Sequence, residues 1–169
     1  AALKAALRAH AQYHREAEPA LRKLNITLWT ASAGDQRASL FYGLIQTATG
    51  RVCGAAAGRP SIVVLGKRGW RPLSQACSPL GEGPETEFEP CACELNPGEA
   101  LVVFTEGTRE ARDSRGRPLG EAVLAEHLAG KSRLPADRLA ARARKHLEGF
   151  GAAPSGADRT LLVVKRAPA

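Results

Sequence analysis

Two acidic residues stand at the ends of predicted strands. Glu106 follows the apolar run 101–104 and precedes Gly107, where the chain can turn away. Asp158 comes just before a second apolar run, 160–165. Carboxylate oxygens held by rigid elements are the ligands that Mg²⁺ and Mn²⁺ prefer. The pair would form half of a metal site if the two strands were neighbours. Spacing alone leaves that open, and solvated strand-end carboxylates are the other interpretation.

The four histidines give little sign of a second kind of chemistry. His10 and His14 are four residues apart in a predicted helix, but no further ligands accompany them, so we interpret them as exposed helical residues. His127 and His146 are isolated in the sequence. No Ser, His and Asp set has a nucleophile motif, and no glycine-rich phosphate loop follows a strand. A nucleophilic hydrolase or nucleotide kinase is therefore not indicated.

The cysteine spacing argues against a zinc site. Cys91 and Cys93 are separated by one residue and would lie on the same face of a strand. Zinc ligands more often have two to four residues between them. We therefore predict reduced, half-buried thiols at all four positions, which are Cys53, Cys77, Cys91 and Cys93.

Predicted helices lie at the start and end of the chain, with strands between them. This grouping predicts an α+β fold in which antiparallel sheet packs under helical layers. Pro90 favours an edge strand, whereas the apolar runs 101–104 and 160–165 indicate buried strands. We expect helices over 1–15, from Pro19 through Leu28, over 119–129 and over 135–148, and strands over 40–45, 51–58, 61–65, 69–73, 86–95, 101–104 and 160–165.

Length and composition are those of one globular domain over residues 1–169. No stretch is apolar enough to span a bilayer and no signal peptide is visible, so we expect a cytoplasmic protein. The net charge of +7 comes from scattered basic residues, and only 5% of residues are aromatic. A solvated basic surface explains this pattern better than nucleic-acid binding. Because the chain starts within a helical pattern and lacks Met, we expect an upstream piece to be missing.

Several motifs occur along nearly the whole chain, after the predicted helical hairpin. They are Ala-Ser-Leu-Phe-Tyr-Gly-Leu-Ile (38–45), Thr-Ala-Thr-Gly-Arg-Val (47–52), Ala-Gly-Arg-Pro (57–60), Asn-Pro-Gly-Glu-Ala-Leu-Val-Val-Phe-Thr-Glu-Gly-Thr-Arg-Glu-Ala-Arg (96–112) and Ala-Asp-Arg-Thr-Leu-Leu-Val-Val (157–164). In this order the chain resembles bacterial SpoIIE-type phosphatases. These are PP2C-like (PPM) serine/threonine phosphatases that oppose anti-sigma-factor kinases by dephosphorylating anti-anti-sigma proteins.

The resemblance implies a PP2C-like sandwich of two antiparallel sheets flanked by helices, with a two-metal Mn²⁺ or Mg²⁺ site at one end. It assigns metal binding to Glu106 and Asp158, and motif turns to Gly107, Gly58 and Arg59. The chain would be the C-terminal portion of the usual domain. The family's Gly-Asp-Val-Ser-Gly-His-Gly motif, with its metal-bridging Asp, would lie before Ala1.

Three motifs depart from the family pattern. Thr-Asp-Gly is Thr-Glu-Gly at 105–107, and Asn-Ala-Gly-His-Pro is Ala-Ala-Gly-Arg-Pro at 56–60. Asp-Asp-Ile-Thr is Ala-Asp-Arg-Thr at 157–160, so Ala157 replaces an Asp that is normally a ligand. Glu in place of Asp moves the carboxylate by about an ångström, which misplaces a bound ion. We therefore expect weak or absent metal binding and poor turnover.

Three functions remain open at the level of the sequence. The first is a SpoIIE-type phosphatase that acts on an anti-anti-sigma type phosphoprotein or another signalling protein. The second is a catalytically dead pseudophosphatase of the same fold that binds a signalling partner, which Glu106, Ala157 and Arg59 favour. The third, suggested by charge alone, is a basic nucleic-acid-binding domain.

Overall fold

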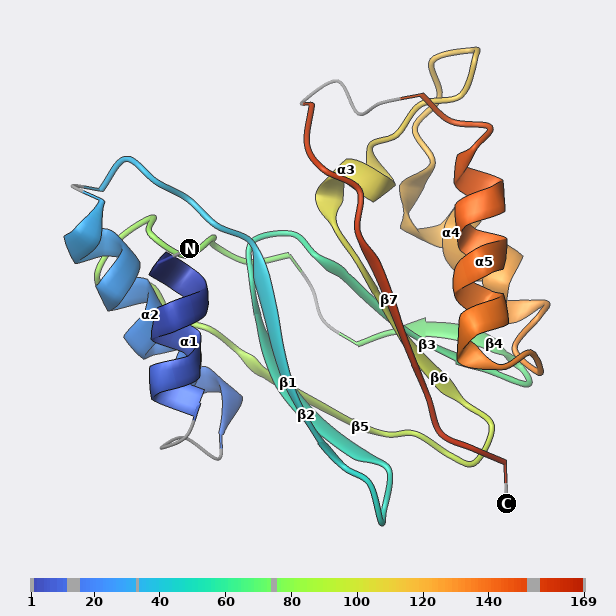
Figure 1. The fold of residues 1–169 in the computed structure, drawn as a ribbon, viewed down its shortest axis with the longest axis horizontal. Helices are drawn as coiled ribbons and strands as arrows, with labels where there is room; N and C mark the ends of the chain where they lie inside the picture. The colour runs from blue at the N-terminus through green and yellow to red at the C-terminus, as the bar shows by residue number, and fades with distance from the viewer. Residues whose placement is uncertain (1, 12–15, 33, 74–75, 152–155, 169) are drawn as a thin grey trace. The chain divides into compact units, whose positions relative to one another are not determined.

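The chain divides into two compact units, shown in the computed structural model of Figure 1. The structure describes residues 2–11, 16–32, 34–73, 76–151 and 156–168. The first unit comprises Ala1–Pro60 and Ser74–Glu94, and the second comprises Ser61–Leu73 and Leu95–Ala169. Gly58 and Arg59 therefore belong to the first unit, whereas Glu106 and Asp158 belong to the second.

The first unit is a helical hairpin on a three-stranded antiparallel sheet of order β1-β2-β5. Leu21 and Leu24 are fully buried and form a cluster with Ala55 and Ala57 of the central strand. Alternate residues of a strand face the same side, so these two alanines present one small, flat surface to the helix. The elements are α1 (Ala2–Ala11), α2 (Ala17–Ala31), β1 (Leu40–Gln46), β2 (Arg51–Ala57) and β5 (Pro90–Glu94).

A buried asparagine fastens the long loop of this unit to α2. The Asn25 side chain is fully buried, and its Nδ2 donates to the Gly83 carbonyl at 2.8 Å. Its Oδ1 accepts a hydrogen bond from the Gly81 amide, also at 2.8 Å. Because a buried amide without partners is costly, this double contact fixes the loop 81–83 against the helix.

The second unit is a four-stranded antiparallel sheet of order β4-β3-β6-β7, covered on one face by two helices. Val63, Val102 and Phe104 point to that face and pack with Leu124 and Leu139 of the helices. The strands are β3 (Ser61–Gly66), β4 (Gly69–Pro72), β6 (Ala100–Phe104) and β7 (Leu161–Lys165), and the helices are α3 (Glu106–Arg109), α4 (Gly120–Ala129) and α5 (Ala136–Leu147).

The predicted α+β class, with two antiparallel sheets flanked by helices, is confirmed. The strand predicted over 86–95 is shorter and runs from Pro90 to Glu94, and Phe88 before it is buried in the first unit's core. Its edge position is confirmed. The first predicted helix, 1–15, is described only as far as Ala11. His14, the side chain of His10 and part of the turn after α2 lie outside the described residues.

The prediction that 160–165 forms a buried strand is wrong. β7 is an edge strand, paired with β6 alone among the described strands, and the Leu162 side chain is 55% exposed. On the β6 side, the Thr160 carbonyl accepts a hydrogen bond from the Thr105 amide, and the Arg166 amide donates to the Glu99 carbonyl. Backbone groups alternate along a strand, so those of Leu161, Val163 and Lys165 point to the open side of the sheet.

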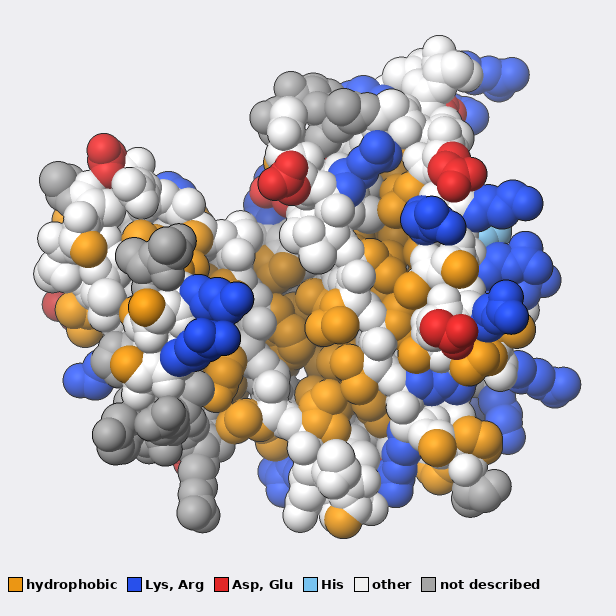
Figure 2. Space-filling view, viewed as in Figure 1, with side chains coloured by type: hydrophobic (Ala, Val, Ile, Leu, Met, Phe, Trp, Pro, Cys, Tyr) orange, Lys and Arg blue, Asp and Glu red, His pale blue; other side chains and the backbone are white. Residues whose placement is uncertain are grey.

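His127 and His146, which we interpreted as isolated from the sequence, lie against each other in the structure. Their rings stack with centroids 4.1 Å apart. Burial, together with the positive charges of His146, Arg142 and Lys131, lowers the pKa of His127. Figure 2 shows Lys and Arg side chains gathered over α5.

The four cysteines are half-buried, as predicted. Cys91 and Cys93 lie on one face of β5, opposite Gly54 and Val52. Burial raises the pKa of the Cys91 thiol. Among the described residues, no helix combines the length and the apolar character needed to cross a membrane.

Candidate functional site

Thr105 connects the end of β6 to the segment that leads into β7. Its amide donates to the Thr160 carbonyl at 3.1 Å. Its Oγ1 donates to the Asp158 carbonyl at 2.9 Å and accepts from the Thr160 amide at 3.0 Å. Three hydrogen bonds from one residue thus hold the two strand ends together. The condition that the strands be neighbours, which the sequence left open, is met by the β6–β7 pairing.

Glu106 starts a short helix rather than an open turn. α3 runs from Glu106 to Arg109, with Thr105 as its N-cap residue in an extended conformation. This helix was not predicted, although a Thr followed by an acidic residue is a common helix start. Glu106 Oε1 accepts a hydrogen bond from Arg109 Nη2 at 3.0 Å, and both side chains are partly exposed. The carboxylate is therefore already balanced by a cation of its own helix.

Gly107 lets the segment before β7 pass directly over α3. A Cβ at this position would lie 2.4 Å from the carbonyl oxygen of Ala157 and 2.6 Å from that of Asp158. The glycine is buried, and only hydrogen fits in this space. The motif turn predicted at Gly107 thus serves close packing of two backbone segments.

Few carboxylates lie at the corner that residues 105–107 and 157–160 form. The Asp158 residue is exposed, and the neighbouring Ala157 offers no side-chain oxygen. Within the described part of the chain, no three or more His, Cys, Asp or Glu side chains gather where they could hold a metal ion. The structure brings the backbones of 105–107 and 157–160 together, but these residues do not by themselves complete a site for Mn²⁺ or Mg²⁺.

The other two predicted motif residues lie in the first unit. Gly58 has a φ of 77°, and a Cβ there would lie 2.1 Å from the Ser39 hydroxyl. Its amide donates to the Ser78 carbonyl at 2.9 Å, and its carbonyl accepts from the Cys77 amide at 3.0 Å. Arg59 follows as an exposed residue. The glycine is required by this tight crossing, which fits the predicted turn.

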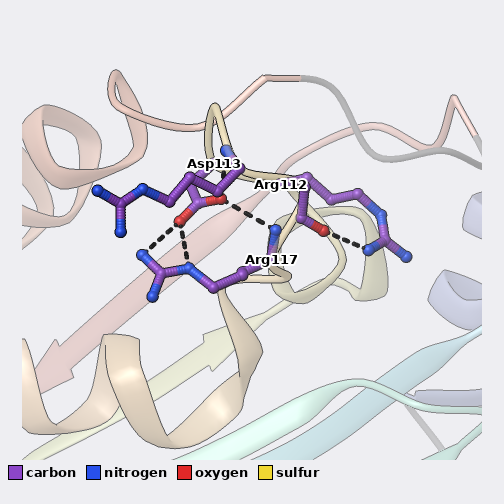
Figure 3. A network of polar contacts seen from close by, with 5 residues as sticks. Arg112, Asp113 and Arg117 are labelled. Carbon is purple, nitrogen blue, oxygen red and sulfur yellow. Dashed lines mark hydrogen bonds and ion pairs between the residues drawn. The ribbon is translucent and has the colours of Figure 1, made fainter.

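The loop after α3 is locked by one carboxylate. Asp113 Oδ1 accepts hydrogen bonds from the amides of Arg115 and Arg117, each at 2.9 Å. Oδ2 accepts from the Arg117 guanidinium at 2.8–2.9 Å, and Arg112 Nη1 donates to the Gly116 carbonyl (Figure 3). The hydrogen bonds that Asp113 accepts from Arg117 and Arg115, led by that of the Arg117 amide, lower its pKa. The loop 112–118 is thus ordered by its own side chains.

Known structures share this fold. The SiaA-PP2C domain of Pseudomonas aeruginosa superposes with a TM-score of 0.81 and 17% identity, covering 97% of this chain and 66% of that chain. The RsbU and RsbW domains of Rv1364c from Mycobacterium tuberculosis give a TM-score of 0.80 and 26% identity, over 99% of this chain and 48% of that one. The two antiparallel sheets with their helices are therefore the PP2C-like phosphatase fold.

Sequence comparison gives the family. Protein IcfG of Synechocystis sp. (strain ATCC 27184 / PCC 6803 / Kazusa) is 28% identical over 92 residues, which are 54% of this chain and 14% of IcfG. The profile of Stage II sporulation protein E (SpoIIE) matches residues 1–167. The chain therefore belongs to the SpoIIE family and has the PP2C-like fold.

Proposed function

We propose that this domain acts in the cytoplasm on phosphoserine or phosphothreonine of an anti-anti-sigma type protein, with catalysis that is impaired in this chain. The observation that carries the proposal is the corner where Thr105–Gly107 packs on 157–160. This corner offers only Glu106 and Asp158 as acidic side chains from the two motifs.

The impairment follows from the chemistry of the donor set. In this fold a pair of Mn²⁺ or Mg²⁺ ions would activate a water molecule and neutralise the phosphate. Glu106 and Asp158 could contribute to holding such ions, but Ala157 contributes nothing through its side chain. A cation at Glu106 would also compete with Arg109 for the same carboxylate. We therefore expect weak metal binding, and we attribute the impaired catalysis to the poor metal site rather than to a defect in the fold.

The residues at this corner would contribute to the reaction by positioning backbone groups and by attracting the substrate. Thr105 and Gly107 fix the position of the Asp158 backbone relative to Glu106. Arg109 and the other cations near the corner would attract an anionic phosphoprotein. These contributions orient and bind the substrate, and they leave the hydrolytic step slow.

The second candidate is a pseudophosphatase that binds a signalling partner without hydrolysis. The Glu106–Arg109 ion pair favours it, because that carboxylate is already balanced without a metal ion. Nucleic-acid binding is the third candidate and has only the net charge of +7 in its favour. A steep loss of DNA or RNA affinity with salt would be required to support it.

Restoring a ligand tests the impairment directly. Mn²⁺ binding, measured by calorimetry, and hydrolysis of p-nitrophenyl phosphate and a phosphoserine peptide are compared for the unchanged chain, Ala157→Asp and Arg109→Ala. We expect Ala157→Asp to raise the Mn²⁺ affinity on the order of tenfold, because it adds a carboxylate to the site. Arg109→Ala should raise it less, by removing the competing cation.

Arg115→Ala is the matched control, since it removes an exposed arginine from the loop after α3 without touching Glu106. Turnover by the unchanged chain at rates on the order of 10 s⁻¹ or faster with Mn²⁺ would overturn the impairment. If Ala157→Asp gained neither Mn²⁺ affinity nor turnover, the corner would not be a phosphatase metal site, and the partner-binding module would be the better description.

A further inference from the structure

A hollow of about 430 Å³ lies in the second unit beside the Thr105–Gly107 corner. Its walls come from α3, α5 and the segment that leads into β7. This volume is within the range of sites that hold a small ligand or one large side chain. The hollow is separate from the two predicted metal-binding side chains, because neither Glu106 nor Asp158 lines it.

Two guanidinium groups line this hollow. Arg159 Nη1 donates to the Phe150 carbonyl at 3.0 Å, with longer contacts to the carbonyls of Leu147 and Gly151. All these bonds use one nitrogen, so the group is held in place while Nε and Nη2 bond to no described residue. Arg144 of α5 makes no hydrogen bond or ion pair with its side chain in the described part of the chain. Both guanidinium groups therefore line the hollow without an ion pair to a described acidic residue.

The remaining walls are largely apolar. Ala140, Leu147 and Leu161 contribute aliphatic carbon, and Thr108 is fully buried beneath the corner. The Thr108 hydroxyl is used by the fold itself, since it donates to the Thr160 carbonyl at 3.3 Å. A ligand that fits this lining has an aliphatic body and an anionic end. A glutamate side chain has both.

The position of the hollow relates it to the proposed reaction. Thr108 follows Glu106 by two residues, and Thr160 follows Asp158 by two residues. A peptide whose phosphorylated residue reached the corner would pass its neighbouring side chains over this hollow. We propose that the Arg144–Arg159 hollow binds the side chain of a glutamate near the phosphorylated residue of the partner protein, and so selects acidic partners. The inference rests on the proposed function for the identity of the partner.

Glu148 also lines the hollow, and its negative charge would repel a bound glutamate. Removing this charge therefore tests the proposal. Glu148 is exposed at the end of α5, so Glu148→Gln removes that charge with little disturbance of the core. A glutamate-binding hollow should bind more tightly after this change. If Arg144 and Arg159 only stabilised the fold, Glu148→Gln would not increase the affinity for glutamate.

The first experiment needs no phosphoprotein. The ¹⁵N-labelled chain is titrated with N-acetyl-glutamate methylamide and, separately, with its glutamine counterpart, while amide shifts are followed by NMR. We expect the glutamate compound to shift the amides of Thr108, Leu147 and Leu161, with a Kd on the order of 1–10 mM for so small a ligand. The glutamine compound should bind at least fivefold more weakly, because a charge-assisted bond to guanidinium is lost.

Variants separate this hollow from the basic surface in general. Arg144→Ala should weaken glutamate binding on the order of tenfold, and Glu148→Gln should strengthen it about twofold. Arg138→Ala is the matched control, because it removes an exposed arginine from the same helix outside the hollow. Equal shifts with the glutamate and glutamine compounds, or equal losses in Arg144→Ala and Arg138→Ala, would overturn the proposal. Tighter binding of inorganic phosphate at the same amides would also overturn it, in favour of a phosphate site.

Peptides then connect the hollow to the phosphatase. Phosphoserine peptides with Glu, Gln or Lys at each flanking position are compared for binding and for hydrolysis with Mn²⁺. We expect at least one position where Glu is preferred over Gln about fivefold and where Arg144→Ala removes the preference. If phosphopeptides bind without such a position, the inference fails while the proposed function stands. If glutamate binds the hollow but no phosphopeptide binds or reacts, the proposed function fails and the hollow remains a glutamate site.

Discussion

The close approach of Ala157 and Asp158 to α3 can be tested by giving residue 107 a side chain. In Gly107→Ala the new Cβ would lie 2.4 Å and 2.6 Å from two carbonyl oxygens. Both are backbone atoms, so neither can rotate away. An ordinary contact for a Cβ begins at 3.4 Å. The segment 157–158 must therefore retreat by about an ångström from α3.

The cost can be worked from that displacement. Overpacking of this kind destabilises a protein by about 1–3 kcal/mol. The retreat also stretches the 2.9 Å hydrogen bond from Thr105 Oγ1 to Asp158 beyond bonding distance, which costs about 1 kcal/mol more. Alanine is a better helix former than glycine, and this offsets about 1 kcal/mol. We expect Gly107→Ala to lower the free energy of unfolding by about 1–3 kcal/mol.

Urea denaturation measures the change in stability, and amide hydrogen exchange locates it. The Thr160 amide, which donates to Thr105 Oγ1, should lose protection in the variant. Gly130→Ala is the control, because its nearest contact would be 3.9 Å from the Glu126 carbonyl and its φ is −60°. That variant should be unchanged or stabilised by up to about 1 kcal/mol.

A Gly107→Ala protein as stable as the unchanged chain, with the Thr160 amide still protected, would refute this reasoning. It would show that residues 157–158 do not rest on α3. The two strand ends would then have no fixed relation, and the candidate site would lose its geometric basis.

Two further predictions concern polar groups that hold loops in place. Asn25→Ala removes both bonds to the 81–83 loop and leaves the groups that Asn25 bonded unsatisfied. Urea denaturation should therefore show a free energy of unfolding lower by about 2–3 kcal/mol. A decrease of less than about 0.5 kcal/mol would contradict this prediction. The pKa of Asp113 is lowered in the folded chain, so its contribution to stability is present above the unfolded value near 3.9 and is lost as pH falls through the folded pKa. Melting temperatures of Asp113→Asn should therefore lie below those of the unchanged chain at pH 6 and approach them near pH 2, and parallel pH profiles would argue against the Asp113 cluster.

Much of the fold could be predicted because local signals and the final contacts agree. The alternating and apolar runs predicted the strands, and Pro135 marked the start of α5. Pro90 identified the edge strand, since it cannot donate a hydrogen bond to a neighbour. In these segments the same residues determine both the local conformation and the packing.

The errors occur where the deciding partner is distant in the sequence. The apolar residues of β7 resemble a central strand, but strand order depends on pairing between remote segments, and nothing in the described sheet pairs with its outer side. His127 and His146 are 19 residues apart and stack only because α4 and α5 pack together. The same holds for the Arg144–Arg159 hollow, which three separate elements create.

The candidate site was predictable in its residues but not in its construction. The order of motifs identified Glu106, Gly107 and Asp158. It gave no sign that Thr105 would join the two strand ends, or that Arg109 would pair with Glu106, because α3 was not expected. Four residues are too few for a periodic pattern, so the Thr-Glu pair at 105–106 was the signal that could have indicated this helix.

The edge position of β7 among the described strands has a consequence for how this chain behaves in concentrated solution. Its one charged residue, Lys165, turns its ammonium group inward to the carbonyls of Gly98 and Ser132, so it does not guard the edge. Leu162 and the outward backbone groups beside it form a template on which another copy can add a strand. The positive net charge keeps copies apart at low ionic strength, and added salt screens that repulsion. Colloidal stability should therefore fall as salt rises, and a charged residue in place of Leu162 should restore it.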